Sequence, residues 1–267
     1  MLGIGFGAIE DAAIPVAVFE LDAGLSASYG GSGQTWANIV TAPADGSGQT
    51  AYDFYRGATS GSEGSDPTFN GSAGANSANE YFSFDGGDYL TLAGSNTTFL
   101  NNLHKENAAF TWYGFLETPS DLTQFGLFGT KSNISTNIGL DFSSNNNGNV
   151  SFSVGNGSGL AINVNTGNAF IAASTKCFVA LSYEEATGTG LVYRKAAAGK
   201  ATVGISGSYS SPSSSAAAYT LQVFANGNGT FIARNGAKLW RTGMFNRALT
   251  EAQLDALFER HKSKLGL

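Results

Sequence analysis

The chain has 267 residues, of which 42% are hydrophobic and 13% charged, and its formal net charge at pH 7 is −6. This apolar content excludes wholesale disorder, and the acidic balance without a basic run gives no electrostatic support to a nucleic-acid partner. The single cysteine, Cys177, excludes an intrachain disulfide, and no apolar stretch approaches the roughly 20 residues that span a bilayer, so no membrane segment is predicted.

Residues 1–13 form an apolar arm in which Leu2, Ile4 and Phe6 alternate with glycines. Alternation places these side chains on one face of an extended chain, and glycine leaves the backbone permissive. Two interpretations stay open: a first strand of the protein's own sheet, or an arm that docks on a neighbouring subunit by extending an exposed sheet edge. The segment lacks Lys and Arg, so we do not expect a secretory signal.

The first half of the chain predicts short strands separated by turns. Residues 15–22 (PVAVFELD) read as the first strand, and the glycine-rich residues 56–80 predict a long surface excursion. In residues 81–92 two phenylalanines share one face before a tight Asp-Gly turn, which is a hairpin pattern. Residues 108–118 are apolar on both faces, as is typical of a central strand covered on both sides.

The second half continues the strand pattern with cleaner alternation. Residues 150–154 and 160–164 place Val, Phe, Leu and Ile on one face and small polar residues on the other. Residues 177–183 and 190–196 predict a hairpin, and Cys177 within the first of these strands is expected to be a buried, unreactive thiol. Short strands at this spacing predict an all-β fold made of two antiparallel sheets packed as a sandwich.

One short helix is predicted at residues 250–263. Thr250 and Gln253 have the spacing of a capping box. Leu254, Leu257 and Phe258 follow at i, i+3 and i+4, so they form a stripe that is expected to press on the sandwich.

Four phrases, in this order, carry a resemblance to a known family. They are SYGGSGQTWANI, YFSFDGGDYLTL, FTWYGFLET and LWRTGMFNRALTEAQLDAL, and together they extend from residue 28 to residue 257. In this arrangement the chain resembles the concanavalin A-like, or laminin-G-like (pentraxin-type), jelly-roll domains, as found in bacteriophage structural proteins. The resemblance implies one jelly-roll domain over residues 14–267. It does not imply an activity, because enzymes, lectins and passive building blocks all use such sandwiches.

The residues needed for catalysis are not present in a productive pattern. Glucanases on this type of sandwich use three carboxylates along one strand, whereas Glu20 and Asp22 on the first strand have no third acid. The two histidines, His104 and His261, fall in a surface turn and at the helix end, where we expect them to be solvated. We therefore predict that the protein is not an enzyme and holds no resident cofactor.

Calcium is the one metal that the resemblance leaves open, because relatives bind it at one rim of the sandwich. Asp85, Asp88 and Asp141 are the candidate ligands, since hard cations prefer clustered oxygens. Turn formation is the preferred interpretation of these aspartates.

The leading functional hypothesis is a non-enzymatic bacteriophage virion structural protein, such as a capsid decoration protein, head fibre or tail component, assembled in the host cytoplasm. Its partners would be other virion proteins and further copies of itself, docked through Leu2, Ile4 and Phe6. The alternative is a carbohydrate-binding adhesin that recognises host surface glycans through Tyr29, Tyr52 and Tyr55. Trp36 could also serve, although core packing is its preferred role.

Overall fold

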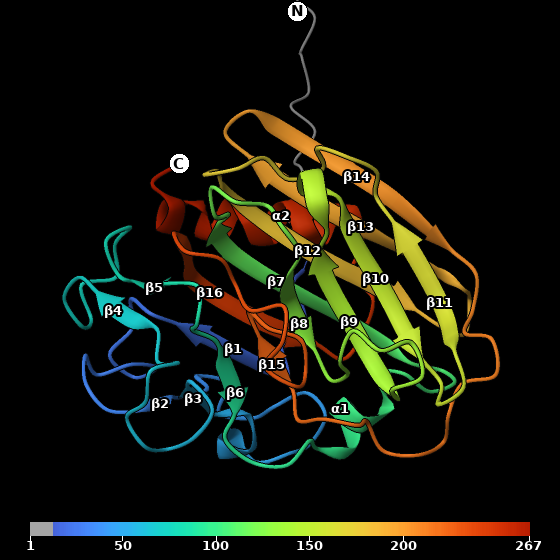
Figure 1. Cartoon of the computed structure of the whole chain (residues 1–267). Coiled ribbons are helices and arrows are strands. Elements are labelled where there is room, and N and C mark those ends of the chain that lie inside the picture. The colour runs from blue at the N-terminus through green and yellow to red at the C-terminus, as the bar shows by residue number, and fades with distance from the viewer. Residues whose placement is uncertain (1–12) are drawn as a thin grey trace, which may run out of the picture.

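Two antiparallel β-sheets face each other across an apolar core (Figure 1). The computed structural model describes residues 13–267. The first sheet has eight strands in the order β14-β13-β12-β7-β16-β5-β4, with β1 also paired to β16. Its strands are β1 (Phe19–Asp22), β4 (Thr68–Asn70), β5 (Tyr81–Phe84), β7 (Ala109–Glu117), β12 (Lys176–Glu184), β13 (Thr189–Ala196), β14 (Gly199–Ser206) and β16 (Ala237–Phe245).

The second sheet also has eight strands, in the order β11-β10-β9-β8-β15-β6-β3-β2. They are β2 (Thr35–Trp36), β3 (Phe54–Arg56), β6 (Leu90–Leu92), β8 (Phe125–Gly129), β9 (Gly139–Ser144), β10 (Val150–Gly155), β11 (Leu160–Asn165) and β15 (Gln222–Val223). The predicted hairpin of residues 177–183 and 190–196 is confirmed as the β12–β13 pair, in continuous register from Cys177↔Ala196 to Glu184↔Thr189.

Aromatic side chains fill the space between the sheets. Trp112 from β7 stacks on Phe128 from β8 with ring centroids 5.0 Å apart, and it meets Phe142 from β9 edge-on at 5.9 Å. Such pairs add about 0.5–1.5 kcal/mol to the free energy gained by burying their area. The core therefore joins the central strands of both sheets.

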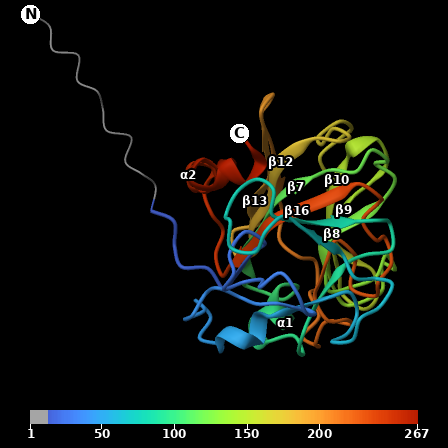
Figure 2. The same ribbon diagram turned by 90° about the vertical axis from the view of Figure 1, so that its left-hand side faces the viewer.

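The outer face of the first sheet is covered by α2 (Glu251–His261) and a following 3-10 turn, η3 (Lys262–Leu265), as Figure 2 shows in side view. The predicted capping box is present at Thr250 and Gln253. Leu254, Leu257 and Phe258 are buried and belong to one apolar cluster with side chains of β7, β12, β13 and β16, among them Tyr113, Phe115, Phe178, Tyr193 and Trp240. One face of β7 therefore packs in the core between the sheets and the other packs against α2, so the strand is covered on both sides as predicted.

These features confirm the predicted fold class, an all-β antiparallel sandwich with a short C-terminal helix. Three short helical turns were not predicted: α1 (Thr98–Asn102) and the 3-10 turns η1 (Gln49–Tyr52) and η2 (Asn146–Gly148). No helix within residues 13–267 has the length and apolarity needed to cross a bilayer. The arm residues Leu2, Ile4 and Phe6 lie outside the described residues.

Two local predictions need correction. Strands β5 and β6 do not form a hairpin, because β5 pairs with β4 and β16 in one sheet while β6 pairs with β3 and β15 in the other. The Asp85–Asp88 turn therefore carries the chain between the sheets. The predicted surface excursion at residues 56–80 contains a strand, β4, which forms the edge of the first sheet.

Candidate functional site

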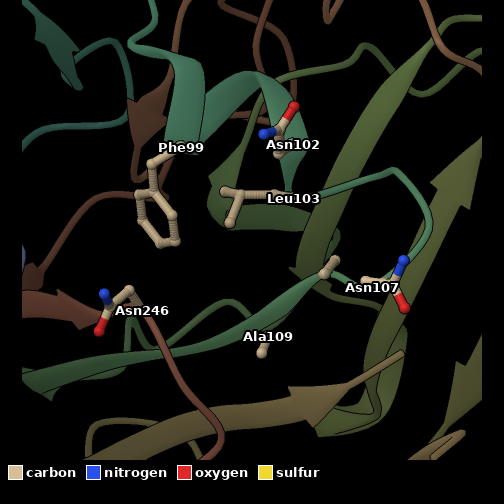
Figure 3. A pocket seen from close by; sticks show the side chains of 7 residues that line it. Phe99, Asn102, Leu103, Asn107, Ala109 and Asn246 are labelled. Atoms are coloured by element: carbon tan, nitrogen blue, oxygen red, sulfur yellow. The ribbon is translucent and has the colours of Figure 1, made fainter. Parts of the chain in front are cut away.

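A pocket of about 270 Å³ opens between α1, the start of β7 and the end of β16. Figure 3 shows its side chains: Phe99 and Asn246 lie together at one side, Asn107 lies at the other, and Leu103 and Ala109 lie between them. Asn102 and Ala108 complete the lining. We call this set of seven residues the amide pocket.

Helix α1 supplies one wall of the pocket, and hydrogen bonds at its N-terminus hold it in position. The hydroxyl of Thr97 caps the helix by accepting a hydrogen bond from the Leu100 amide at 3.3 Å. The same hydroxyl is 2.8 Å from the Tyr52 hydroxyl, which donates to the Asp45 carboxylate. Burial, reinforced by the Asp45 carboxylate, raises the pKa of Tyr52, so this hydroxyl keeps its proton. Tyr52 thereby fastens α1 to the loop that contains Asp45.

The second wall is Asn246, which begins the sequence Asn-Arg-Ala-Leu between β16 and α2. This turn is held to the sheet by Thr111, whose hydroxyl accepts from the Leu249 amide at 2.9 Å and lies 2.9 Å from the Arg247 carbonyl. The Asn246 side chain donates to the Ala44 carbonyl at 3.0 Å. Thr111 therefore holds the turn in place, and Ala44 orients the Asn246 side chain within it.

Asn107 forms the third wall on the loop between α1 and β7. It adopts a positive φ of 61°, a conformation that asparagine tolerates better than most residues. The Glu185 carboxylate accepts a hydrogen bond from the Asn107 amide at 2.7 Å, and the Glu185 amide donates to the Ala108 carbonyl at 2.7 Å. Glu185 is itself buried, at 6% exposed. Glu185 therefore fixes the backbone of the loop, while the Asn107 side chain stays exposed.

Two of the three side-chain amides of the amide pocket, those of Asn102 and Asn107, are available to a ligand, whereas Asn246 Nδ2 already donates to Ala44. Within residues 13–267, Asn102 and Asn107 make no hydrogen bond through their side-chain amides, and Asn246 Oδ1 is buried without a partner. The amides of Asn102 and Asn107 each offer two donors and an acceptor, and Phe99 adds a half-buried aromatic ring. None of the seven lining residues is ionisable. The arrangement can orient a polar, uncharged molecule, but it contains no group that exchanges protons with one.

The aromatic residues predicted to contact glycans occupy other places. Tyr29 and Tyr52 are 1% and 0% exposed, so neither ring is free to stack on a sugar, and that part of the prediction is corrected. Tyr29 packs between Phe69 and Phe82, each at a ring distance of 5.0 Å. Trp36 is fully buried, in its preferred core role. Only Tyr55, on β3, keeps part of its surface exposed.

Removing the Tyr52 hydroxyl should loosen the wall that α1 provides. We expect Tyr52→Phe to lower the free energy of unfolding by about 1–3 kcal/mol, because the Asp45 carboxylate and the Thr97 hydroxyl both lose a buried partner. Tyr55→Phe is the matched control, three residues along and partly exposed, and should cost under ~0.5 kcal/mol. Urea unfolding of both variants tests this, and equal stability of the two would contradict the role assigned to Tyr52.

The two carboxylates considered for glycosidase chemistry are held in ion pairs away from the amide pocket. Arg241 Nη1 is 2.7 Å from Asp22 Oδ2, and Arg241 Nη2 is 2.8 Å from Glu20 Oε2. Lys264 Nζ lies 2.8 Å from Asp22 Oδ1, and the Tyr113 hydroxyl donates to Glu20 at 2.7 Å. Asp22 is fully buried. These carboxylates therefore balance buried cations.

The three calcium candidates do not form a common site. Asp85 and Asp88 share the turn between β5 and β6, where the Asp88 carboxylate accepts from the Asp85 amide at 2.9 Å. Asp141 lies on β9, 5% exposed, and accepts from the Ser143 hydroxyl at 2.8 Å. Burial raises the pKa of Asp88 and of Asp141 to about 6. Among residues 13–267 no group of three or more His, Cys, Asp or Glu side chains could hold a metal ion.

Both histidines are less solvated than expected. His104 is fully buried directly behind α1, with Nε2 3.0 Å from the Ser215 carbonyl, and burial lowers its pKa. Burial, with the nearby Arg241, lowers the pKa of His261 to about 3. Cys177 is buried as predicted, and burial raises the pKa of its thiol to about 12, which keeps it protonated.

The similarity of this chain to known proteins lies in its fold and not in its sequence. No family model matches the chain, and no curated protein matches its sequence. Among solved structures, the CBM40 domain of the Ruminococcus gnavus IT-sialidase, bound to α2,3-sialyllactose, matches with a TM-score of 0.50 at 15% identity, covering 68% of this chain and 98% of that one.

Two structures of Trypanosoma rangeli sialidase match over 92% of this chain. The complex with a 2,3-difluoro-KDN gives a TM-score of 0.55 at 14% identity, and the complex with sialic acid gives 0.51 at 15%. The chain spans only 33% of those sialidase chains. At such low identity the shared feature is the architecture, so this chain has a β-sandwich of the type found in sialidase-related domains.

Proposed function

We propose that the protein is a non-catalytic carbohydrate-binding module and that the amide pocket is its glycan site. The observation that carries this proposal is the lining of the pocket: Asn102 and Asn107, whose side-chain amides make no hydrogen bond within residues 13–267, share it with the ring of Phe99, and Asn246, which donates to Ala44, closes one side. Sugars present hydroxyl groups that both donate and accept hydrogen bonds, together with C–H faces that pack on aromatic rings. A pocket of amides around one ring matches both properties.

The fold is compatible with this role. The R. gnavus domain, which has a similar architecture, was solved with sialyllactose bound. The absence of ionisable groups among the lining residues favours binding over hydrolysis, since glycoside hydrolysis ordinarily requires a pair of carboxyl groups at the scissile bond.

The virion role predicted from the sequence gains no support from the similar structures, which are sialidases and a sialidase module. It depends largely on the arm residues Leu2, Ile4 and Phe6, which the structure does not describe. A protein on the surface of a particle can also bind host glycans, so the two roles are compatible. Mass spectrometry of purified phage particles tests the virion role independently.

The glycan site is tested by replacing its ring. We expect Phe99→Ala to weaken binding on a glycan array about 5- to 150-fold, by analogy with the loss of about 1–3 kcal/mol per base when an aromatic ring that stacks on a nucleic-acid base is removed. Tyr55→Ala is the matched control, because Tyr55 is the one partly exposed ring among the residues first predicted to contact glycans. Binding that survives Phe99→Ala but is lost in Tyr55→Ala would place the site on β3 instead.

A further inference from the structure

A second pocket lies against the amide pocket, and the two share Asn107. It has a volume of about 400 Å³ and is lined by Lys105, Glu106, Asn107, Pro212, Ser213 and Ser214. The loop that carries the last three residues is held near α1, because the His104 ring lies 3.0 Å from the Ser215 carbonyl and the Ala217 amide donates to Asn101 at 3.1 Å. The loop that lines the second pocket is therefore held in place beside the amide pocket.

We propose that these two pockets are consecutive subsites for an uncharged oligosaccharide of at least two sugar units, which passes over Asn107. This inference rests on the proposed function and specifies its ligand. The first argument is size: at about 270 Å³ the amide pocket is smaller than the roughly 300–1,000 Å³ of typical ligand pockets, whereas the pair of pockets falls within that range.

The second argument is the position of Asn107 between the pockets. Its backbone is fixed by Glu185 through a 2.7 Å hydrogen bond, while its side chain is exposed and has no partner within residues 13–267. Because the backbone is ordered before binding, a ligand has to immobilise only the Asn107 side chain and not the loop that carries it, which reduces the entropic cost of the contact. A group in this place can contact both units of a chain that crosses from one pocket to the other.

The third argument is charge. A carboxylate brought into the amide pocket would find no cation among its lining residues. The buried Glu185 carboxylate lies behind the Asn107 wall, and the lining of the second pocket contains one cation, Lys105, and one anion, Glu106, so it has no net positive charge. Taking a carboxylate out of water without a paired cation is unfavourable. The site therefore favours uncharged glycans, unlike the sialylated ligand of the R. gnavus domain.

The test uses the full chain on an array of neutral glycans that are one, two and three sugar units long. Each two-unit and three-unit glycan is printed beside its sialylated form, for example lactose beside α2,3-sialyllactose. We expect two-unit neutral glycans to bind at least 10-fold better than one-unit glycans, and sialylation to weaken binding. Ser214→Trp, at an exposed position in the second pocket, should reduce two-unit binding to the one-unit level and leave one-unit binding unchanged.

The outcomes separate this inference from the proposed function. If Phe99→Ala abolishes binding but one-unit and two-unit glycans bind equally, the protein has a glycan site and the second subsite is refuted. Stronger binding of the sialylated partner would refute the uncharged class. If no glycan on the array binds, the proposed function fails, and this inference fails with it.

Discussion

Replacing Arg241 with methionine should destabilise the protein by about 3–5 kcal/mol, the range found when one partner of a buried ion pair is removed. Arg241 is 5% exposed and bridges Asp22 and Glu20 at 2.7 and 2.8 Å. Burial by itself would lower the pKa of Arg241, but Tyr113 and the two carboxylates more than compensate and raise it. Methionine retains much of the apolar stem, so the expected loss comes from the carboxylates left without their cation.

The control for this prediction is Arg247→Met, six residues along the chain. Arg247 is exposed, and substitution of an exposed residue normally changes stability by less than about 0.5 kcal/mol. Urea unfolding at pH 7 measures both variants. A loss below ~1 kcal/mol for Arg241→Met would mean that Lys264, which lies 2.8 Å from Asp22, balances the buried charge by itself.

Acidification should destabilise the protein through His261. Its pKa in the folded state is about 3, below the ordinary value of 6.5. Above pH 6.5 the ring is neutral in both states and has no effect. As the pH falls below 6.5, the unfolded chain takes up a proton that the folded chain refuses, so stability is lost at up to about 1.4 kcal/mol per pH unit. Partial exposure of the ring reduces this through solvent screening.

A comparison with His261→Gln isolates this effect. Asp88 and Asp141, with pKa values raised to about 6, bind protons more readily in the folded state and so oppose the loss below pH 6. Their contribution is the same in both proteins and cancels in the difference. Between pH 6.5 and 4.5 we expect the wild type to lose about 1–2 kcal/mol more than the variant. Parallel stability curves would show that His261 titrates normally.

The fold could be predicted because its strongest signals are local. The alternation of β10 and β11, the doubly apolar β7 and the capping box at Thr250 each depend on residues close in sequence. The assignment of strands to sheets could not be read in the same way. A turn such as Asp85–Asp88 has the same sequence pattern whether it joins two strands of one sheet or carries the chain across to the other.

The candidate site was missed because its parts come from distant segments. Phe99 and Asn107 are joined to Asn246 only by tertiary structure, and a single helical turn such as α1 is too short for a periodic pattern. The tyrosines predicted in their place show the converse difficulty. Tyr52 and Tyr55 are three residues apart with similar neighbours, yet one is buried and the other partly exposed. Only the packing of the sheets decides which ring faces water.

The pairing of β1 with β16 has a consequence for biosynthesis. The register Phe19↔Met244 to Asp22↔Arg241 joins one of the earliest strands to the last one, and Lys264 completes the charge balance of Asp22. As the chain leaves the ribosome, Phe19 and Leu21 must wait for more than two hundred further residues before their sheet partner exists. Contacts of such long range are slow to form and leave apolar segments unprotected meanwhile. The first sheet therefore cannot be completed until β16 has been synthesised.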